Sequence, residues 1–393
     1  MAAAAPRGAL GTTFGTTLVA TAVDTAGVLP IYLVGAMAVQ LQAAIQLEIE
    51  SLGVVFAAYF AAAALLSAPV GRLTDRIDPA AFLWTGCVIC LIAILGMSLI
   101  HSVGALVLLA VVSGIATAFT RTTSSMLVVR GIPPQRQGLA LGVRNCAIPT
   151  AALLSGLAVP AVALTIGWRW AFVIAAGLAS GVFVVLPWSV PRPNQPAAAA
   201  TQPDMRTGSL AGLAVAGALA STAAVSLGAY TALTAVEAGM SEGAAGILIA
   251  AGSLVGVSSR IGVGWWTDRR PGSQLDVVIG MMLIGAIGYG LISFQVEPLL
   301  WAAVPAAYAT GWAFYGSYYL SVIRLNPAAT GAAVGKAQSG AFAGSIVGPI
   351  ALGTLASRAT FSTAWLAAML AAAAAAVTIT VVELSVRKTA DSR

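Results

Sequence analysis

Four ionisable residues lie within long apolar segments of the chain, where charges are rarely found. They are Asp24, Arg121, Arg144 and Arg260. Each costs roughly 2.5 to 3.5 kcal/mol near the centre of a membrane-spanning helix, so such residues usually face a protein interior or a watery cavity. Three positive charges against one negative charge leave a surplus that an anionic ligand would neutralise. These residues therefore predict an anion-binding site inside a membrane protein.

Arg260 is the strongest candidate for direct contact with the anion. It precedes Asp268 by eight residues, or about 12 Å along a helix, which places it well below the helix end. A guanidinium group there can form two parallel hydrogen bonds with a carboxylate. The alternative is that Arg260 pairs structurally with a neighbouring helix.

Other polar side chains could complete this site. Arg121 lies in a run of Thr and Ser residues that is unlike a lipid-facing surface. Arg144 lies nearer the inner end of its segment and could extend to the membrane interface. Asn145 and Gln338 are 193 residues apart, and their amides could bind a ligand or cross-link helices.

Asp24 is the single acidic residue in the middle of an apolar segment. Burial and a neighbouring arginine act in opposite directions on a carboxyl group, so its protonation can change with its surroundings. Asp24 is therefore the candidate for a residue that takes up and releases a proton. The alternative is a fixed ion pair with one of the arginines.

Aromatic residues are the last group of candidates. Tyr308, Trp312, Tyr315 and Tyr319 have spacings of 4, 3 and 4 residues, which place them on one face of an α-helix. The stripe predicts either ordinary packing or a wall of the site, with Tyr315 and Tyr319 directing hydroxyl groups at the ligand. Tyr32 is a further candidate from another segment.

The composition identifies the class of protein. Hydrophobic residues make up 59% of the 393 residues and charged residues only 8%, whereas soluble domains carry about 25% charged residues. The chain is therefore expected to be an integral membrane protein with an uncleaved first helix. It has no pattern for nucleic-acid binding, and its three cysteines do not form a disulfide framework.

Twelve segments have the length of about 20 mostly apolar residues that a spanning helix requires. An all-helical membrane fold with twelve transmembrane helices follows. The expected spans are residues 11–35, 49–70, 80–100, 104–128, 138–162, 170–188, 209–235, 244–266, 275–294, 299–323, 332–355 and 361–384.

A short charged motif shows that the chain consists of two repeats. The sequence from Gly71 to Arg76 recurs 193 residues later, from Gly264 to Arg269, with Gly, Thr, Asp and Arg in the same register. A polar, Pro-rich stretch lies between the two copies at residues 189–208. We therefore expect an N-terminal six-helix half at 1–188, a cytoplasmic linker at 189–208 and a C-terminal six-helix half at 209–393.

The distribution of charges predicts the orientation. Most Lys and Arg residues outside the spans fall on the side of the termini, which makes that side cytoplasmic by the positive-inside rule. A cell-membrane protein with both termini in the cytoplasm is expected. The opposite side carries Glu48, Glu50, Glu237, Glu242 and Glu297.

Twelve segments in two repeats, a central linker and a duplicated Gly-x-x-x-Asp-Arg motif resemble the major facilitator superfamily. The resemblance implies two halves around a central cavity that opens alternately to each side. It also implies a conformational latch, although Ile77-Asp78-Pro79-Ala80 replaces the Gly and basic residues that usually follow the motif. The matching latch residues are Gly71, Asp75 and Arg76, with Gly264, Asp268 and Arg269 in the second copy.

A second resemblance concerns the substrate. The stretch from Arg260 to Asp268 is similar to helix 8 of proton-linked monocarboxylate transporters and related bacterial organic-anion carriers. In those proteins the matching arginine holds the substrate carboxylate. The resemblance implies a secondary active transporter of a small organic anion, a monocarboxylate, driven by proton symport. Such a protein is expected to work as a monomer in the lipid bilayer without a cofactor.

Other functions fit the sequence less well. A proton-coupled exporter of drugs would usually carry a longer Gly and Pro pattern in helix 5, of which only Pro149 remains. A sensor or scaffold would usually carry a soluble output domain. An enzyme is not expected, because no catalytic group of residues can be assembled. No metal site is expected either, since His101 has no ligand partners nearby and Cys87 and Cys90 lie within a span.

Overall fold

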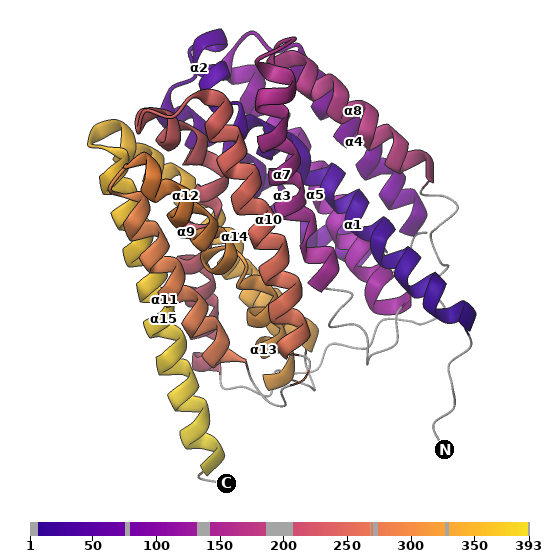
Figure 1. Ribbon diagram of the computed structural model, residues 1–393. Helices are drawn as coiled ribbons and strands as arrows, with labels where there is room; N and C mark the ends of the chain where they lie inside the picture. Colours follow the sequence, from indigo (N-terminus) through magenta and orange to yellow (C-terminus); the bar gives the residue numbers. More distant parts are fainter. Residues whose placement is uncertain are drawn as a thin grey trace.

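The computed structural model describes residues 7–74, 79–131, 142–185, 207–267, 269, 274–326 and 330–391. Within these ranges the regular elements are helices and there is no strand (Figure 1). Ten of the described helices are long and apolar enough to cross a membrane, and a shorter apolar helix occupies residues 168–183. A further helical run between residues 297 and 325 is interrupted. The expected all-helical, multi-pass membrane fold is therefore confirmed.

The helices are named here in two groups by their order in the chain. The N-set consists of α1 (Arg7–Ala36), α2 (Ala38–Ile45), α3 (Ile49–Thr74), α4 (Pro79–Ser98), α5 (Val103–Gly131), α7 (Ala147–Ala158), the π-helix η2 (Val159–Ala163) and α8 (Trp168–Val185). Residues 142–145, before α7, are also helical.

The C-set consists of α9 (Thr207–Glu237), α10 (Glu242–Thr267), α11 (Leu275–Ile292), α12 (Glu297–Ala306), the π-helix η4 (Ala307–Gly311), α13 (Tyr315–Leu325), α14 (Thr330–Arg358) and α15 (Phe361–Asp391). The division into two halves joined by a linker at 189–208 stays a prediction. Most of that linker lies outside the described residues.

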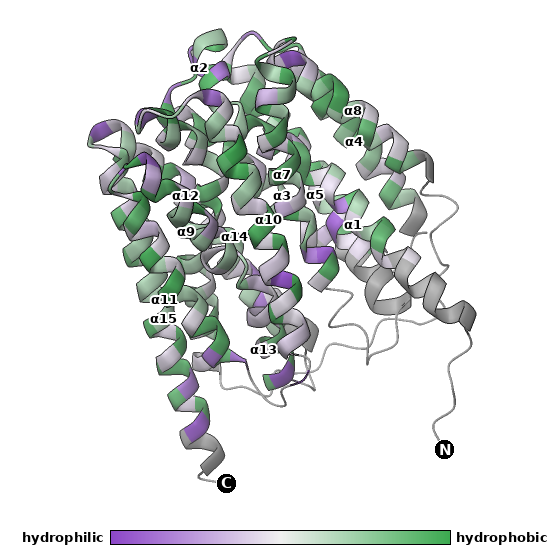
Figure 2. Cartoon of the chain, in the orientation of Figure 1, coloured by the Kyte–Doolittle hydropathy of each residue, from purple (hydrophilic) through white to green (hydrophobic). Residues whose placement is uncertain are grey.

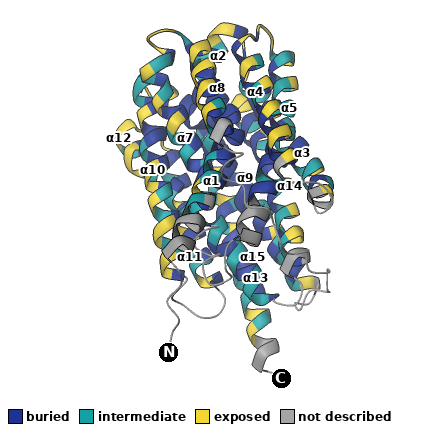
Figure 3. Ribbon diagram, turned by 90° about the vertical axis from the view of Figure 1, so that its right-hand side faces the viewer, coloured by how far each residue is buried: buried dark blue, intermediate teal, exposed yellow. Residues whose placement is uncertain are grey.

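The outer surface of the bundle is apolar, as a lipid environment requires. Leu65, Ile287 and Leu370 are 75%, 62% and 63% exposed, and hydrophilic residues gather mainly near the helix ends (Figure 2). Buried residues fill the interior between the helices (Figure 3). Helices suit this solvent because they satisfy their backbone hydrogen bonds internally.

The two ends of the bundle differ. We call the end where α1 begins and α15 ends the terminal end, and the opposite end, which holds α2, the α2 end (Figure 1). The ribbons of the two sets meet near the α2 end and diverge toward the terminal end. Gln40 on α2 donates a hydrogen bond to Glu242 on α10 at 2.7 Å, which joins the two sets at the α2 end.

Glycines let the two sets touch through their backbones near the α2 end. A Cβ atom added to Gly156 on α7 would lie 2.5 Å from the carbonyl oxygen of Gly246 on α10, and the reverse distance is also 2.5 Å. Gly53 on α3 meets the carbonyl oxygen of Pro349 on α14 in the same way. We call these contacts the glycine seal.

The glycine seal predicts the effect of adding one methyl group. Gly246→Ala should open the α2 end, because overpacking costs about 1 to 3 kcal/mol and shifts the equilibrium by roughly 5- to 150-fold. Distances between spin labels at exposed His101 and Phe294, one in each set, would measure this. Gly177→Ala is the control, since an added Cβ there has no neighbour within 4 Å. Equal distances in the two variants would contradict the prediction.

The prediction of one continuous helix at 299–323 is wrong. The run breaks into α12, the π-helix η4, a turn and α13. Pro305 removes one backbone donor just before η4, and the Trp312 amide donates five residues back to Ala307 at 3.0 Å. The expected single aromatic stripe is therefore divided. Tyr308 packs on Trp312 with ring centroids 4.9 Å apart, and Tyr315 packs on Tyr319 at 6.2 Å.

Candidate functional site

Asp24 on α1 and Arg144 form a buried ion pair. A terminal guanidinium nitrogen of Arg144 lies 2.7 Å from a carboxylate oxygen of Asp24, and the side chains are only 7% and 3% exposed. The hydroxyl of Ser124 on α5 donates to the other Asp24 oxygen at 2.5 Å and accepts from Arg144 Nε at 3.2 Å. The ion pair that was the alternative role of Asp24 is therefore present in this conformation.

This network holds three helical segments of the N-set together. Arg144 also donates to the carbonyl oxygen of Arg121 on α5 at 2.9 Å. The expectation that Arg144 could extend to the membrane interface is wrong, because the whole residue is 6% exposed. Its hydrogen bonds to Asp24, Ser124 and Arg121 compensate for its burial and keep it inside the bundle.

Arg260 on α10 has a different environment. It is 6% exposed, and its guanidinium donates to the backbone carbonyl oxygens of Trp312 at 2.7 Å and Gly256 at 3.4 Å. Its guanidinium carbon lies 5.9 Å from the centre of the Trp312 ring. Among the residues that the structure describes, no carboxylate pairs with Arg260. Among the described contacts, backbone dipoles and an aromatic face meet its positive charge, so Arg260 is paired with a neighbouring helical run in this conformation, which was its alternative role.

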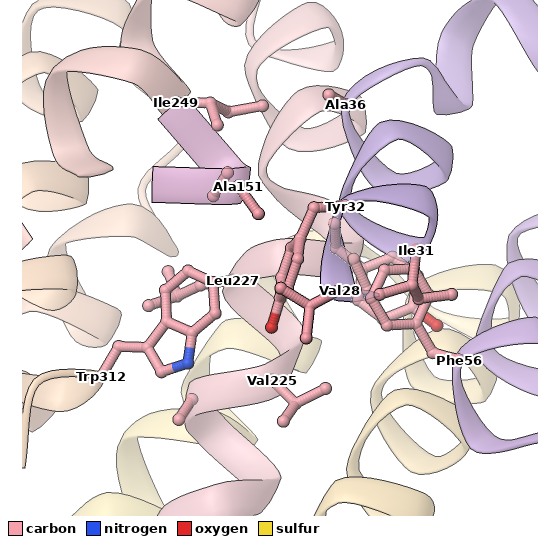
Figure 4. Packing of buried hydrophobic residues seen from close by; sticks show 14 of the residues in the cluster. Val28, Ile31, Tyr32, Ala36, Phe56, Ala151, Val225, Leu227, Ile249 and Trp312 are labelled. Carbon is pink, nitrogen blue, oxygen red and sulfur yellow. The ribbon is translucent and has the colours of Figure 1, made fainter. Parts of the chain in front are cut away.

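Tyr32 and Trp312 meet where the two sets come together. Their ring centroids are 5.5 Å apart with a tilt of 50°. The Tyr32 ring on α1 also packs directly on Gly228 of α9, where glycine has no side chain to keep the two helices apart. Figure 4 shows the rings of Tyr32 and Trp312 facing each other, with Leu227 and Val225 beside them. Trp312 therefore contacts both Tyr32 of the N-set and Arg260 of the C-set.

Tyr315 and Tyr319 on α13 lie in the same region. Both are partly buried, and the Tyr315 hydroxyl donates to Ser221 on α9 at 2.8 Å. Arg121 on α5 is partly buried. The N-set and the C-set thus each contribute an arginine to the interior of the bundle.

The two predicted amides are less closely connected. Asn145 follows Arg144 directly, and Gln338 lies on α14, each partly buried. Among the described hydrogen bonds, none joins either amide to Arg260. Their role in ligand binding stays a prediction.

The structure describes only part of the predicted latch. Gly71 lies near the end of α3, Gly264 lies on α10, and Arg269 is exposed after α10 with its guanidinium carbon 3.7 Å from the centre of the Trp265 ring. Asp75, Arg76 and Asp268 lie outside the described residues. The role of the motif as a latch stays a prediction.

Sequence reasoning missed three serines that hold these charged and aromatic groups. Ser124 bridges the ion pair, Ser221 holds Tyr315, and Ser259 donates to the carbonyl oxygen of Ala309 at 2.5 Å. Ser124 stood out weakly because it belongs to a polar run. Ser221 and Ser259 gave no signal, since serines are common where membrane helices pack. Within the described ranges, no three His, Cys, Asp or Glu residues are grouped as metal ligands.

Solved structures with the same fold include two of a bacterial homologue of the human lysosomal transporter Spinster, both inward-facing. The unoccupied form has a TM-score of 0.67 and 16% identity, covering 94% of this chain and 95% of that chain. The occupied form has a TM-score of 0.68 and 16% identity, covering 93% and 94%. At this identity the likeness shows a shared fold.

Sequence comparison gives the family. An uncharacterised MFS-type transporter of Mycobacterium tuberculosis is 31% identical over 120 residues, which are 30% of this chain and 21% of that protein. The match thus spans about a fifth of the relative's length. The family model described as Major Facilitator Superfamily matches residues 12–335, most of the chain. The chain therefore belongs to the major facilitator superfamily.

Proposed function

We propose that this protein is a secondary active transporter that carries a small organic anion, a monocarboxylate, by alternating access with proton symport. The observation that carries this proposal is the buried Arg260 guanidinium between the two sets, which has backbone carbonyls rather than a described carboxylate as partners. One carboxylate would supply the negative charge that this group lacks. Guanidinium and carboxylate groups match in geometry as well as in charge.

The arrangement of the helices supports alternating access. The two sets touch at the glycine seal and at Tyr32 and Trp312, on the side of the α2 end. Movement of one set against the other would open that side and close the terminal end, with Arg260 near the middle in both states. The proposed orientation places the termini in the cytoplasm of a cell, so that this conformation faces inward. The working unit in this proposal is one chain.

The remaining candidates have roles around the same anion. Arg121 adds positive charge from the N-set, and Tyr315 and Tyr319 line the space beside Arg260. Asn145 and Gln338 supply amides. Asp24 is the proton-coupling residue, because breaking its pair with Arg144 in another conformation would leave a carboxylate that takes up a proton. Substrate and proton would then act on different residues of one cavity.

A ligand screen tests the proposal. The purified protein is heated with acetate, lactate, benzoate, inorganic anions or lipophilic cations at two pH values, and uptake into proteoliposomes is measured for compounds that stabilise it. We expect at least one monocarboxylate to raise the melting temperature and to be taken up faster with an imposed proton gradient. Stabilisation by cations alone would refute the anion proposal and favour a drug exporter.

A further inference from the structure

The break in the helical run 297–325 exposes backbone carbonyl groups to α10. Trp312 is followed by a turn, and its carbonyl oxygen accepts no backbone hydrogen bond in the described part of the chain. Two consecutive residues of α10 supply the missing donors. Ser259 donates to the Ala309 carbonyl at 2.5 Å, and Arg260 donates to the Trp312 carbonyl at 2.7 Å. The break is therefore held in place from outside by α10.

From this geometry we infer that Arg260 exchanges the Trp312 carbonyl for the substrate anion, and that this exchange releases the break so that α13 can move. The inference rests on the proposed function, because it requires an anion at Arg260. Ser259 is then a positioning residue. It does not contact the substrate. Its hydrogen bond to the Ala309 carbonyl determines how stable the broken conformation remains once Arg260 no longer donates to the Trp312 carbonyl.

The exchange favours the anion because hydrogen bonds between charged groups are stronger than those to a neutral carbonyl. The Trp312 carbonyl then loses its donor inside the protein, which destabilises the broken conformation. A ligand shifts a conformational equilibrium only through a difference in its affinity for the two states. Here the two affinities differ because the broken conformation uses the Arg260 guanidinium to hold the Trp312 carbonyl. The anion needs the same guanidinium, so it binds more tightly when the break is released.

A spare donor lies beside the break. The hydroxyl of Tyr289 on α11 is fully buried, has no hydrogen-bond partner in the described structure, and packs against Gly311 in η4. An unpaired buried hydroxyl destabilises the conformation that contains it relative to one in which it is paired. After the exchange, Tyr289 can donate to a carbonyl of the rearranged segment. Hydrogen-bond donors are thus available for both conformations of residues 307–314: Ser259 and Arg260 in the broken one, and Tyr289 in the rearranged one.

The movement would reach the terminal end. The segment α13 runs from Tyr315 to Leu325 and packs against α14, which begins at Thr330. A change at residues 312–314 therefore alters how α13 lies against α14 at the terminal end, where the two sets diverge in this conformation. Filling of the site would in this way favour closure of the terminal end.

The test measures closure directly. Spin labels are placed at exposed Leu73 on α3 and Lys336 on α14, with the buried Cys87, Cys90 and Cys146 replaced by Ala. Acetate, lactate and benzoate are the probes. In the otherwise unaltered protein, a bound probe should shorten the distance between the labels. In Ser259→Ala, the shorter distance should be populated about fivefold more before any probe is added, which corresponds to the loss of one hydrogen bond.

Ser258→Ala is the matched control, because its hydroxyl is exposed and bonds within its own helix to Leu254. Equal distance distributions in Ser258→Ala and Ser259→Ala would refute the inference. If Ser259→Ala does not fold, Tyr289→Phe replaces it. That variant should bind the probe with an unchanged label distance, and a full closure would refute the inference. Absence of probe binding in the unaltered protein would instead refute the proposed function.

Discussion

Arg260→Gln should abolish carboxylate uptake and weaken carboxylate binding by about 30- to 5,000-fold. This range corresponds to the loss of about 2 to 5 kcal/mol, which is typical when one partner of a buried, charged hydrogen-bonded pair is removed. The change gives up the hydrogen bond from the terminal Arg260 nitrogen to the Trp312 carbonyl, but it also removes a buried charge that no described carboxylate balances, so folding should persist. Flux into proteoliposomes and carboxylate-dependent melting temperatures would measure the two effects separately.

The control for this variant removes a positive charge elsewhere. Arg387 is exposed on α15, where its partner is Glu383 one turn away. Arg387→Gln should therefore retain uptake and binding, because surface ion pairs contribute little. Full uptake by Arg260→Gln would remove Arg260 from the substrate site and withdraw the main support for an anion carrier.

Asp24→Asn should destabilise the protein by about 3 to 5 kcal/mol, because it leaves the buried charge of Arg144 without its counter-charge. The double variant Asp24→Asn with Arg144→Gln removes both charges and should recover most of this loss. Denaturant unfolding in detergent would measure the free energy of unfolding for each variant. Glu383→Gln is the control, because its partner Arg387 is exposed and the pair should contribute under about 1 kcal/mol.

The same double variant tests proton coupling. If Asp24 takes up the coupled proton, carboxylate uptake by the double variant should no longer respond to an imposed pH gradient, while carboxylate binding at Arg260 remains. An unchanged response would show that another residue carries the proton. The ion pair would then have only the structural role that its geometry already demonstrates.

Those features of the candidate site that depend on one helix alone could be predicted from the sequence. The depth of Arg260 follows from its distance along one helix, and the structure buries it. The pairing of Asp24 with Arg144 could not be derived, because the two residues are 120 positions apart and three arginines competed for one carboxylate. Helix packing made that choice, and Ser124 completes it.

The helical run from Glu297 to Leu325 shows the opposite case. Its hydropathy predicted one membrane span, and the run is long enough to be one. The prediction of a single aromatic face, however, assumed a regular α-helix throughout. Pro305 was the visible warning, yet a proline inside a membrane helix often leaves the helix continuous. Carbonyl groups at Ala309 in the π-helix and at Trp312 just after it accept hydrogen bonds from Ser259 and Arg260, which belong to another helix. Spacing within one segment therefore could not reveal the break.

The glycine seal has a consequence for the conditions under which the protein works. Gly156 and Gly246 bring uncharged backbones into contact, and neither residue has a side chain that salt can screen or a proton can alter. The backbone contact between Gly156 and Gly246 should therefore be nearly independent of ionic strength and acidity, whereas the Gln40–Glu242 hydrogen bond and the Arg358–Glu50 ion pair at the same end involve charged groups. Protonation of Glu242 or salt screening at Glu50 would weaken those polar contacts and leave the backbone contact of the glycine seal intact.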